Sequence, residues 1–200
     1  MKIIGITGGV GSGKSRVLSF MEERFQAVIC QADHVAWELQ EPGQVCYKEI
    51  VAHFGTSVLN EDMTLNRKTL GQIVFQDINE LWKLNQIMHP VVKKEIKNRI
   101  QQEKEKGTKL FVLEAALLIE EDYGEICDEL WYIYTSEPIR RLRLKESRQY
   151  NDEKIDAIMA TQLSEEVFRK ECQRIIDNSG NFEETCAQLE EAVKVSTRSC

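Results

Sequence analysis

The chain has 200 residues, of which 42% are hydrophobic and 30% charged, and its formal net charge at pH 7 is −7. This length suits one sizeable core with an inserted subdomain. The negative charge argues against broad electrostatic binding to nucleic acid or to an anionic membrane, so we expect neither as a partner. The first residues resemble a core strand, which leaves no room for a signal peptide, and no apolar run could span a bilayer. We therefore expect a cytoplasmic protein.

Cysteine and histidine show no metal-binding pattern. The six cysteines are scattered, at positions 30, 46, 127, 172, 186 and 200. They form no C-x-x-C pair and no Cys/His ligand spacing, so we expect reduced structural thiols rather than a zinc site. His53 and His89 also lack a partner at ligand spacing, which favours packing or hydrogen-bonding roles over metal ligation.

The first fifteen residues carry a complete phosphate-loop motif, G-x-x-x-x-G-K-[ST]. An apolar run from Ile3 to Thr7 leads directly into Gly8-Gly9-Val10-Gly11-Ser12-Gly13-Lys14-Ser15. The order strand, glycine-rich turn, helix start argues against a glycine-rich turn before an ordinary helix. We expect the glycines to let the backbone wrap around the β-phosphate, Lys14 to bridge the β- and γ-phosphates, and Ser15 to ligate Mg²⁺. The motif predicts a nucleoside triphosphate site but not the reaction.

An aspartate follows the second predicted strand, which we place at Ala27 to Cys30. In an open parallel sheet, ligands bind beyond the carboxyl ends of the strands, so Asp33 lies where chemistry is expected. Asp is also a frequent N-cap, and Asp33 could instead cap a helix that begins at Val35. The sequence leaves both interpretations open.

The composition changes from residue 42 to residue 107. Glu41-Pro42-Gly43 ends a helix, and the following segment holds several helical patterns but no convincing strand. Within it, Asn66-Arg67 starts a helix and His89-Pro90 is expected to interrupt another. We interpret 42–107 as a mostly helical insertion into a core formed by 1–41 and 108–200.

The chain returns to the sheet after Gly107. Leu110 to Glu114 is an apolar run that ends in a carboxylate, as expected of a buried parallel strand whose tip can reach a magnesium shell. We expect a central strand at Leu130 to Tyr134, a last strand and turn at Arg174 to Gly180, a closing helix at Phe182 to Val195, and a frayed tail. The fold class is therefore α/β, with three layers around a five-stranded parallel sheet.

A basic run follows Pro138 and consists of Arg140, Arg141, Arg143, Lys145 and Arg148. Such a run is usually a solvated helix face. This protein is acidic overall, however, and the run follows a sheet strand in a phosphate-loop protein. We therefore favour an arginine-bearing lid around 138–165, because planar guanidinium groups suit phosphate oxygens.

Together, these features resemble the dephospho-CoA kinase family over nearly the whole chain. The matching blocks are I-x-G-I-T-G-G-V-G-S-G-K-S, Ala32-Asp33, Glu41-Pro42-Gly43 with Tyr47, His53-Phe54-Gly55, Asn66-Arg67-Lys68-x-Leu70-Gly71, Val74-Phe75, Leu84-Asn85-x-Ile87-x-His89-Pro90 and Asp177-Asn178-Ser179-Gly180. The resemblance implies an enzyme of coenzyme A biosynthesis that uses Mg-ATP to phosphorylate the ribose 3′-hydroxyl of dephospho-CoA. It implies no obligate protein partner.

The sequence departs from the family pattern at several positions. Gln31 replaces the first Asp of Asp-Ala-Asp, Arg16 replaces the Thr after the phosphate loop, and Cys172-Gln173 replaces Ala-Asp. Glu114-Ala115-Ala116-Leu117-Leu118 stands where the family has Asp-x-Pro-Leu-Leu, so Glu114 is expected to act through a longer arm.

The family resemblance also implies the residues of the site. Asp33 matches the catalytic base, and Lys14, Arg143 and Arg148 match residues that act in transfer, although the spacing leaves Arg140 or Arg141 open for the lid. The implied binding residues are Gly8, Gly9, Val10, Gly11, Ser12, Gly13, Lys14, Ser15, Arg16 and Asn178 for ATP, Asp33, Arg67 and His89 for dephospho-CoA, and Ser15 with Glu114 in the outer shell for Mg²⁺.

Two other functions stay open. Another small-molecule or nucleotide kinase would share the core, and only the middle helical blocks argue against it. A nucleotide-binding module without transfer is kept open by Gln31 and Glu114. A signalling GTPase is disfavoured, because the chain has no Asn/Thr-Lys-x-Asp guanine signature.

Overall fold

The structure is a computed structural model that describes residues 1–198. The chain divides into two compact units. The first holds Met1–Cys30 together with the chain from Glu103 onward, and the second holds Gln31–Gln102. No helix within the described residues is long and apolar enough to cross a membrane. Five of the six cysteines are described and none of these five forms a disulfide, whereas Cys200 lies outside the described residues.

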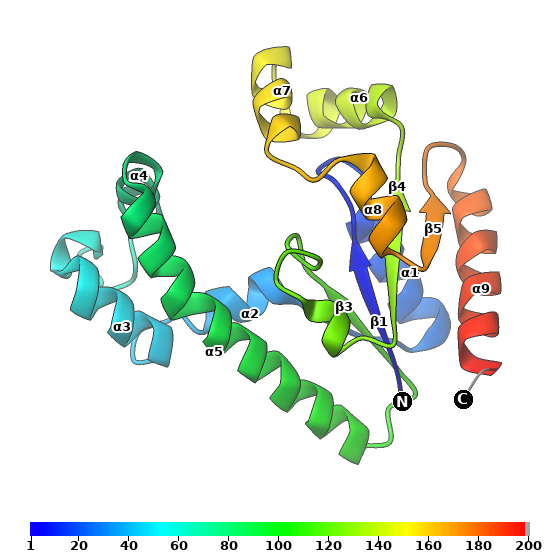
Figure 1. The fold of residues 1–200 in the computed structure, drawn as a ribbon, viewed down its shortest axis with the longest axis horizontal. Helices are drawn as coiled ribbons and strands as arrows, with labels where there is room; N and C mark the ends of the chain where they lie inside the picture. The colour runs from blue at the N-terminus through cyan, green and yellow to red at the C-terminus, as the bar shows by residue number, and fades with distance from the viewer. Residues whose placement is uncertain (199–200) are drawn as a thin grey trace. The chain divides into compact units, whose positions relative to one another are not determined.

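A five-stranded sheet with the order β2-β3-β1-β4-β5 forms the centre of the first unit (Figure 1). β1 pairs in parallel with β3 and with β4, and β4 pairs in parallel with β5. The expected parallel five-stranded sheet is therefore confirmed. The strands are β1 (Lys2–Thr7), β2 (Val28–Gln31), β3 (Leu110–Glu114), β4 (Glu129–Tyr134) and β5 (Arg174–Asp177).

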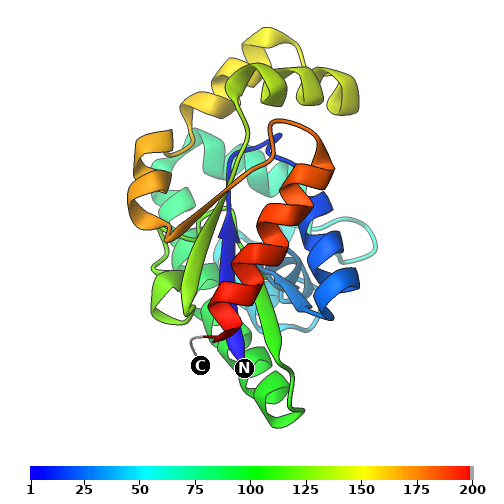
Figure 2. The ribbon, with the colours of Figure 1, turned by 90° about the vertical axis from the view of Figure 1, so that its right-hand side faces the viewer.

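Two helices bury one face of this sheet. α1 and α9 share a hydrophobic core with the strands, and Figure 2 shows α9 running across the strands. The core side chains include Val17 and Met21 of α1, Leu189 and Val193 of α9, and Ile4 and Trp131 of the strands. The helices of this unit are α1 (Lys14–Phe25), the 3-10 helix η2 (Tyr123–Glu125), α6 (Glu137–Arg148), α7 (Asp152–Ala160), α8 (Glu165–Glu171) and α9 (Phe182–Arg198).

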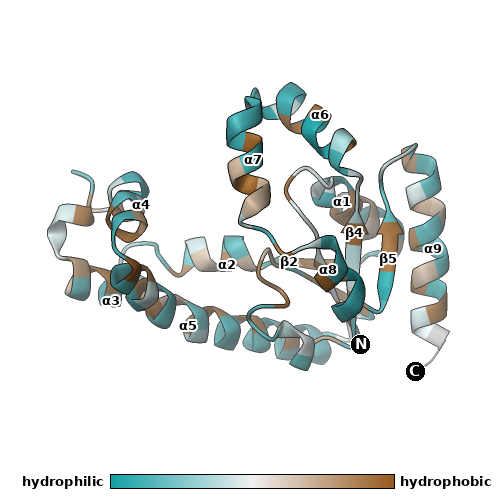
Figure 3. Cartoon of the chain, turned by 45° about the horizontal axis from the view of Figure 1, so that its top comes forward, coloured by the Kyte–Doolittle hydropathy of each residue, from teal (hydrophilic) through white to brown (hydrophobic). Residues whose placement is uncertain are grey.

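The helix that carries the basic run has little apolar surface. In Figure 3, α6 is teal along most of its length, whereas β5 is brown. Leu144 is the buried residue of α6. A helix with so small an apolar face gains little from hydrophobic burial, so polar contacts must hold α6 in place.

The second unit is helical. Apart from Gln31, which ends β2, its β-type pairing is an isolated antiparallel bridge between Leu59 and Leu65. The Asn66 side chain caps α4 by accepting a hydrogen bond from the Thr69 N–H at 3.0 Å. The helices of this part are α2 (Ala32–Glu38), α3 (Val45–Phe54), η1 (Thr56–Val58), α4 (Arg67–Gln76) and α5 (Ile78–Glu105), of which α5 ends in the first unit.

Two sequence-based expectations about helix ends are wrong. His89-Pro90 does not interrupt a helix, because α5 runs through Pro90, whose missing N–H removes one hydrogen bond while the flanking Met88 and Val92 stay buried. The closing helix does not end at Val195 and the tail is not frayed from Ser196, because α9 continues to Arg198; the last two residues of the predicted tail lie outside the described residues. The buried Ser196 donates a hydrogen bond to Glu129 at 2.8 Å, which ties the last turn to the sheet.

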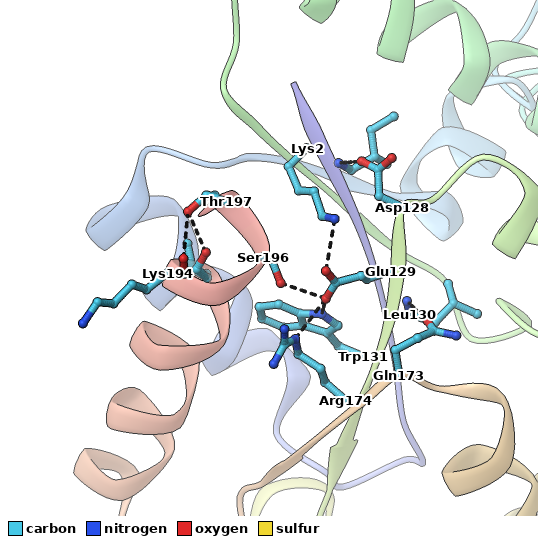
Figure 4. A network of polar contacts seen from close by, with 12 residues as sticks. Lys2, Asp128, Glu129, Leu130, Trp131, Gln173, Arg174, Lys194, Ser196 and Thr197 are labelled. Atoms are coloured by element: carbon cyan, nitrogen blue, oxygen red, sulfur yellow. Dashed lines mark hydrogen bonds and ion pairs between the residues drawn. The ribbon is translucent and has the colours of Figure 1, made fainter. Parts of the chain in front are cut away.

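A polar network closes the amino-terminal end of the sheet (Figure 4). The Glu129 carboxylate, at the start of β4, accepts hydrogen bonds from Trp131 Nε1 at 3.0 Å, Arg174 Nε at 2.9 Å and Ser196 Oγ, and lies 3.0 Å from Lys2 Nζ. Burial by itself raises the pKa of Glu129, but these four partners outweigh it and lower the pKa to about 2. The network therefore ties β1, β4, β5 and α9 together through one carboxylate.

The departure at Gln173 has a structural reason in the same region. The Leu130 N–H of β4 donates to Gln173 Oε1 at 2.7 Å, and the Gln173 N–H donates to the Leu130 carbonyl at 2.9 Å. The Gln173 side chain thus continues the β4–β5 pairing by one residue.

Candidate active site

The phosphate loop connects β1, which ends at Thr7, to α1, which begins at Lys14. Its last residue, Gly13, is the N-cap of α1 and has φ +83°. A Cβ at this position would lie 2.5 Å from Asn178 Nδ2, so both the backbone angle and the space require glycine. The first N–H groups of α1 have no partner within the helix, which makes this end a site for an anion.

The loop lysine lies beside a buried carboxylate. Lys14 Nζ donates to the Gly8 carbonyl at 2.6 Å and is 3.8 Å from Glu114 Oε1. The pairing of β1 with β3 places Glu114 opposite Ile6, one residue before the end of β1. Glu114 therefore lies at the carboxyl end of β3, beside the loop lysine.

Three side chains converge on one carbonyl of the loop. The Ser12 carbonyl accepts hydrogen bonds from Asn178 Nδ2 at 2.7 Å, Thr135 Oγ1 at 3.0 Å and Arg143 Nη1 at 3.4 Å. Arg143 Nη2 also donates to the Asn178 carbonyl at 2.8 Å. These donors fix the orientation of the peptide after Ser12, because a carbonyl held on one side directs the following N–H to the other.

A second arginine of α6 holds another part of the loop. Arg140 Nε donates to the Val10 carbonyl at 2.8 Å, and Arg140 Nη2 donates to Gln162 Oε1 at 2.5 Å. A Cβ on Gly9 would lie 2.4 Å from Arg140 Nη2, so a side chain at this position would displace the guanidinium from its observed place. Burial lowers the pKa of Arg140. Arg140 thus connects the phosphate loop to the turn after α7.

Two further basic residues of α6, Arg141 and Arg148, have partners outside the phosphate loop. Arg141 bonds to Glu137 at 2.8 Å and to Asp156 of α7 at 2.5 Å, and both contacts raise its pKa. Arg148 is the exposed last residue of α6, and its hydrogen bond lowers the pKa of Tyr150. Of the two lid candidates that the sequence left open, the structure brings Arg140 to the loop and Arg141 to α7.

Other predicted nucleotide-binding residues lie around the start of α1. Ser15 and Arg16 are exposed, and the Arg16 guanidinium lies 3.8 Å from the centroid of the Phe182 ring. Asn178 is buried, and its Oδ1 accepts from Thr185 Oγ1 at 3.1 Å while its Nδ2 holds the loop. Contact between Asn178 and ATP stays a prediction.

Two buried hydroxyl groups mark this end of the sheet. Thr7 Oγ1 and Ser12 Oγ have no hydrogen-bond partner among the described residues. A buried unpaired hydroxyl costs about 1–3 kcal/mol, and such groups call for a functional explanation. Both belong to the strand end and loop that would surround the phosphates.

The oxygen groups at the loop suit Mg²⁺ bound together with a nucleotide. Magnesium prefers oxygen ligands and takes one or two from the protein, with the rest from phosphates and water. The Ser15 hydroxyl and the Glu114 carboxylate are groups of this kind. Residues 1–198 contain no cluster of three or more His, Cys, Asp or Glu side chains that could hold a metal by themselves.

The second unit carries the predicted acceptor-binding residues. Asp33 is exposed in the first turn of α2, Arg67 is the exposed first residue of α4, and His89 is partly buried in α5. The N-cap interpretation of Asp33 is wrong, because α2 begins at Ala32 with Gln31 as its cap. The helix starts three residues earlier than expected, and its first residue, Ala32, is buried.

Comparison with known proteins gives the family. The sequence profile described as dephospho-CoA kinase matches residues 2–184. The chain belongs to the dephospho-CoA kinase family. The family consists of ATP-dependent phosphotransferases. A dephospho-CoA kinase from Halalkalibacterium halodurans is 40% identical over 194 residues, which cover 96% of this chain and 95% of the relative.

Solved structures agree with this fold. The crystal structure of TT1252 from Thermus thermophilus has a TM-score of 0.82 at 25% identity, covering 96% of each chain. Dephospho-CoA kinase from Campylobacter jejuni has a TM-score of 0.74 at 21% identity, covering 100% of this chain and 99% of the other.

Sequence reasoning missed two residues that support the phosphate loop. Thr135 directly follows β4, and its place at the carboxyl end of a central strand could have indicated it. Gln162, which bonds to Arg140, lies in the turn after α7 and carries no local signal.

Proposed function

We propose that this chain transfers the γ-phosphate of ATP to the ribose 3′-hydroxyl of dephospho-CoA and so forms coenzyme A. The match to the dephospho-CoA kinase family over residues 2–184 carries this proposal. The complete phosphate loop, with Lys14 beside Glu114, supports the ATP half of the reaction. ATP and dephospho-CoA are the only partners that the proposal requires, and it assigns the reaction to the cytoplasm.

In this proposal, the core of 1–41 and 108–200 holds ATP. Lys14 leaves the Gly8 carbonyl to bridge the β- and γ-phosphates, and the loop N–H groups bind the β-phosphate. Arg143 orients the loop through Ser12, and Arg148 in the lid of 138–165 offsets charge on the moving phosphoryl group. Asn178 and Arg16 border the nucleotide.

The proposal includes Mg²⁺ as the partner of ATP. Ser15 would hold the ion directly, and Glu114 would lie in its outer shell. Bound Mg²⁺ neutralises charge on the phosphate oxygens in this reaction class. Glu114 also keeps the Lys14 ammonium close to the loop, at 3.8 Å.

The helical insertion of 42–107 and the preceding α2 would bind the acceptor. Asp33 orients the 3′-hydroxyl and accepts its proton, while Arg67 and His89 contact the rest of dephospho-CoA. The Asp33 side chain is exposed, so its carboxylate is accessible to the ribose hydroxyl of an incoming substrate. Water must be kept from the γ-phosphoryl group, because it would otherwise accept that group in place of the hydroxyl.

The proposal is tested by ADP release from Mg-ATP with dephospho-CoA, adenosine, AMP or shikimate as the acceptor. We expect acceptor-dependent ADP only with dephospho-CoA, together with a product that has the mass of coenzyme A. ADP release with another acceptor would show that the protein is a kinase with a different substrate.

A nucleotide-binding module is the second candidate, because Gln31 and Glu114 depart from the family pattern. It requires Mg-ATP binding, measured by calorimetry, without ADP production above the acceptor-free rate. Acceptor-dependent turnover would exclude it.

A further inference from the structure

The second unit exposes a cluster of two aromatic rings and one guanidinium, formed by His34 and Trp37 of α2 and Arg67 of α4. The Trp37 side chain is 50% exposed. The His34 ring lies 5.2 Å from the Trp37 ring, centroid to centroid, with 32° between the planes. The Arg67 guanidinium carbon lies 5.2 Å from the Trp37 centroid. We call these three residues the Trp37 cluster.

The charge of Arg67 is not neutralised by a carboxylate in residues 1–198. By contrast, Arg99 of the same unit pairs with both Glu38 and Glu95. An arginine without an acidic partner keeps its planar donors available for phosphate oxygens. The exposed indole beside it offers a flat apolar face, onto which a nucleobase can stack.

The Trp37 cluster lies next to Asp33 on the same helix. Asp33 and Trp37 are four residues apart in α2, so both side chains lie on one face, about one helical turn or 5.4 Å apart. In a nucleoside, the base and the ribose 3′-hydroxyl are separated by a similar distance. A nucleoside whose hydroxyl contacts Asp33 could therefore place its base at Trp37. Its 5′-diphosphate would then need a cation nearby, and Arg67 supplies one.

We propose that the Trp37 cluster binds the adenosine 5′-diphosphate part of the acceptor. Adenine stacks against Trp37 and His34, and Arg67 binds the diphosphate. This assignment rests on the proposed function, because it takes dephospho-CoA as the acceptor and Asp33 as the residue that meets its 3′-hydroxyl. The cluster then determines acceptor specificity by recognising the nucleotide half of dephospho-CoA rather than its pantetheine arm.

Steady-state kinetics of Trp37 variants test the site. We expect Trp37→Ala to raise KM for dephospho-CoA about 5- to 160-fold, the range for losing one base–aromatic stack, with KM for ATP unchanged. Trp37→Phe should recover most of the affinity, since a ring remains. Trp82→Ala is the matched control, because Trp82 is 61% exposed in the same unit and belongs to no proposed site.

A binding titration keeps the test independent of turnover. Trp131 is fully buried, so of the two tryptophans that remain in Trp82→Phe, Trp37 is the solvent-exposed one. Dephospho-CoA added without ATP should quench the fluorescence of this variant saturably. 4′-Phosphopantetheine, which lacks the adenosine, should not.

The outcomes separate this inference from the proposed function. An active Trp37→Ala enzyme with wild-type KM for dephospho-CoA, or equal quenching by 4′-phosphopantetheine, overturns the Trp37 cluster as the nucleotide site. A wild-type enzyme that produces no coenzyme A overturns the proposed function, and the titration then still decides whether the cluster binds the nucleotide.

Discussion

The two ends of the parallel sheet use their polar residues in opposite ways. At the amino-terminal end, Glu129 receives four donors and joins three strands to α9. At the carboxyl-terminal end, side chains hold the loop carbonyls of Val10 and Ser12, while two hydroxyl groups stay buried without partners in the described chain. Polar groups at the first end stabilise the fold, and those at the second orient the phosphate loop.

The largest effect on kcat is expected at the lysine of the phosphate loop. Lys14→Ala should lower kcat about 10²- to 10³-fold, because it removes a cation aimed at charge that develops in the transition state. The free energy of unfolding should fall by about 1–3 kcal/mol, because the variant removes the cation beside the buried Glu114 carboxylate and the hydrogen bond to the Gly8 carbonyl. ADP release and urea denaturation give the two values. Lys145→Ala, which removes an ion pair with Asp152 on exposed surface, is the control. Turnover of Lys14→Ala within tenfold of wild type would contradict the assignment.

At the amino-terminal end of the sheet, we expect a substitution to lower stability and leave kcat unchanged. Glu129→Gln keeps the shape of the side chain but removes the charge that Lys2 and Arg174 neutralise. We expect the free energy of unfolding to fall by about 3 kcal/mol, from the shift of the Glu129 pKa, with kcat of the folded enzyme unchanged. Urea denaturation at pH 7 measures the loss, and Glu190→Gln, which breaks the exposed pair with Arg24, serves as the control. A large fall in kcat at unchanged stability would show that the two ends are not separate.

The Glu129 carboxylate also predicts that the free energy of unfolding depends on pH. The pKa of Glu129 falls from its ordinary value of 4.5 to about 2 on folding. The folded state therefore binds this proton less readily than the unfolded state, and the stabilisation is complete above pH 4.5 and lost as the pH falls toward 2. Wild type should lose about 3 kcal/mol more than Glu129→Gln over this range in urea denaturation at stepped pH. Parallel curves for the two proteins would contradict the pKa shift.

Two neighbouring arginines of α6 test which contacts at the carboxyl-terminal end of the sheet matter for turnover. Arg140→Ala should lower kcat about 10²-fold, because a loop that shifts by about 1 Å misplaces the phosphates. Arg140→Lys should restore part of the rate, since one donor to Val10 returns.

Arg141 provides the matched control for Arg140. Arg141→Ala removes only contacts within α6 and to α7, so we expect wild-type kcat and a loss of stability below about 1 kcal/mol. ADP release and thermal unfolding distinguish the two variants. Equal kinetics for Arg140→Ala and Arg141→Ala would show that the contact with the Val10 carbonyl does not position the loop.

Much of the first unit could be predicted because its signals are local. Apolar runs such as Leu110 to Leu113 indicate buried strands, and the glycines and Lys14 define the loop within eight residues. The family blocks extended the prediction to the fold class and to the five-stranded sheet, both of which are confirmed.

The rest depended on contacts between residues far apart in the chain. Arg140 and Arg141 are indistinguishable in sequence, and only the packing of α6 decides which one meets Val10, 130 residues away from Arg140. Pro90 predicts a break that buried neighbours prevent, and the last turn of α9 is held by Glu129, 67 residues before Ser196. Such contacts leave no periodic signal in the sequence.

The most direct test of the proposed reaction identifies its product. The enzyme is incubated with Mg-ATP and dephospho-CoA, and the acceptor is analysed by mass spectrometry and phosphorus NMR. We expect one phosphate added per ADP released, present as a monoester on the ribose 3′-oxygen. ADP formed without a phosphorylated acceptor, or a phosphate attached at any other position, would contradict the proposed function.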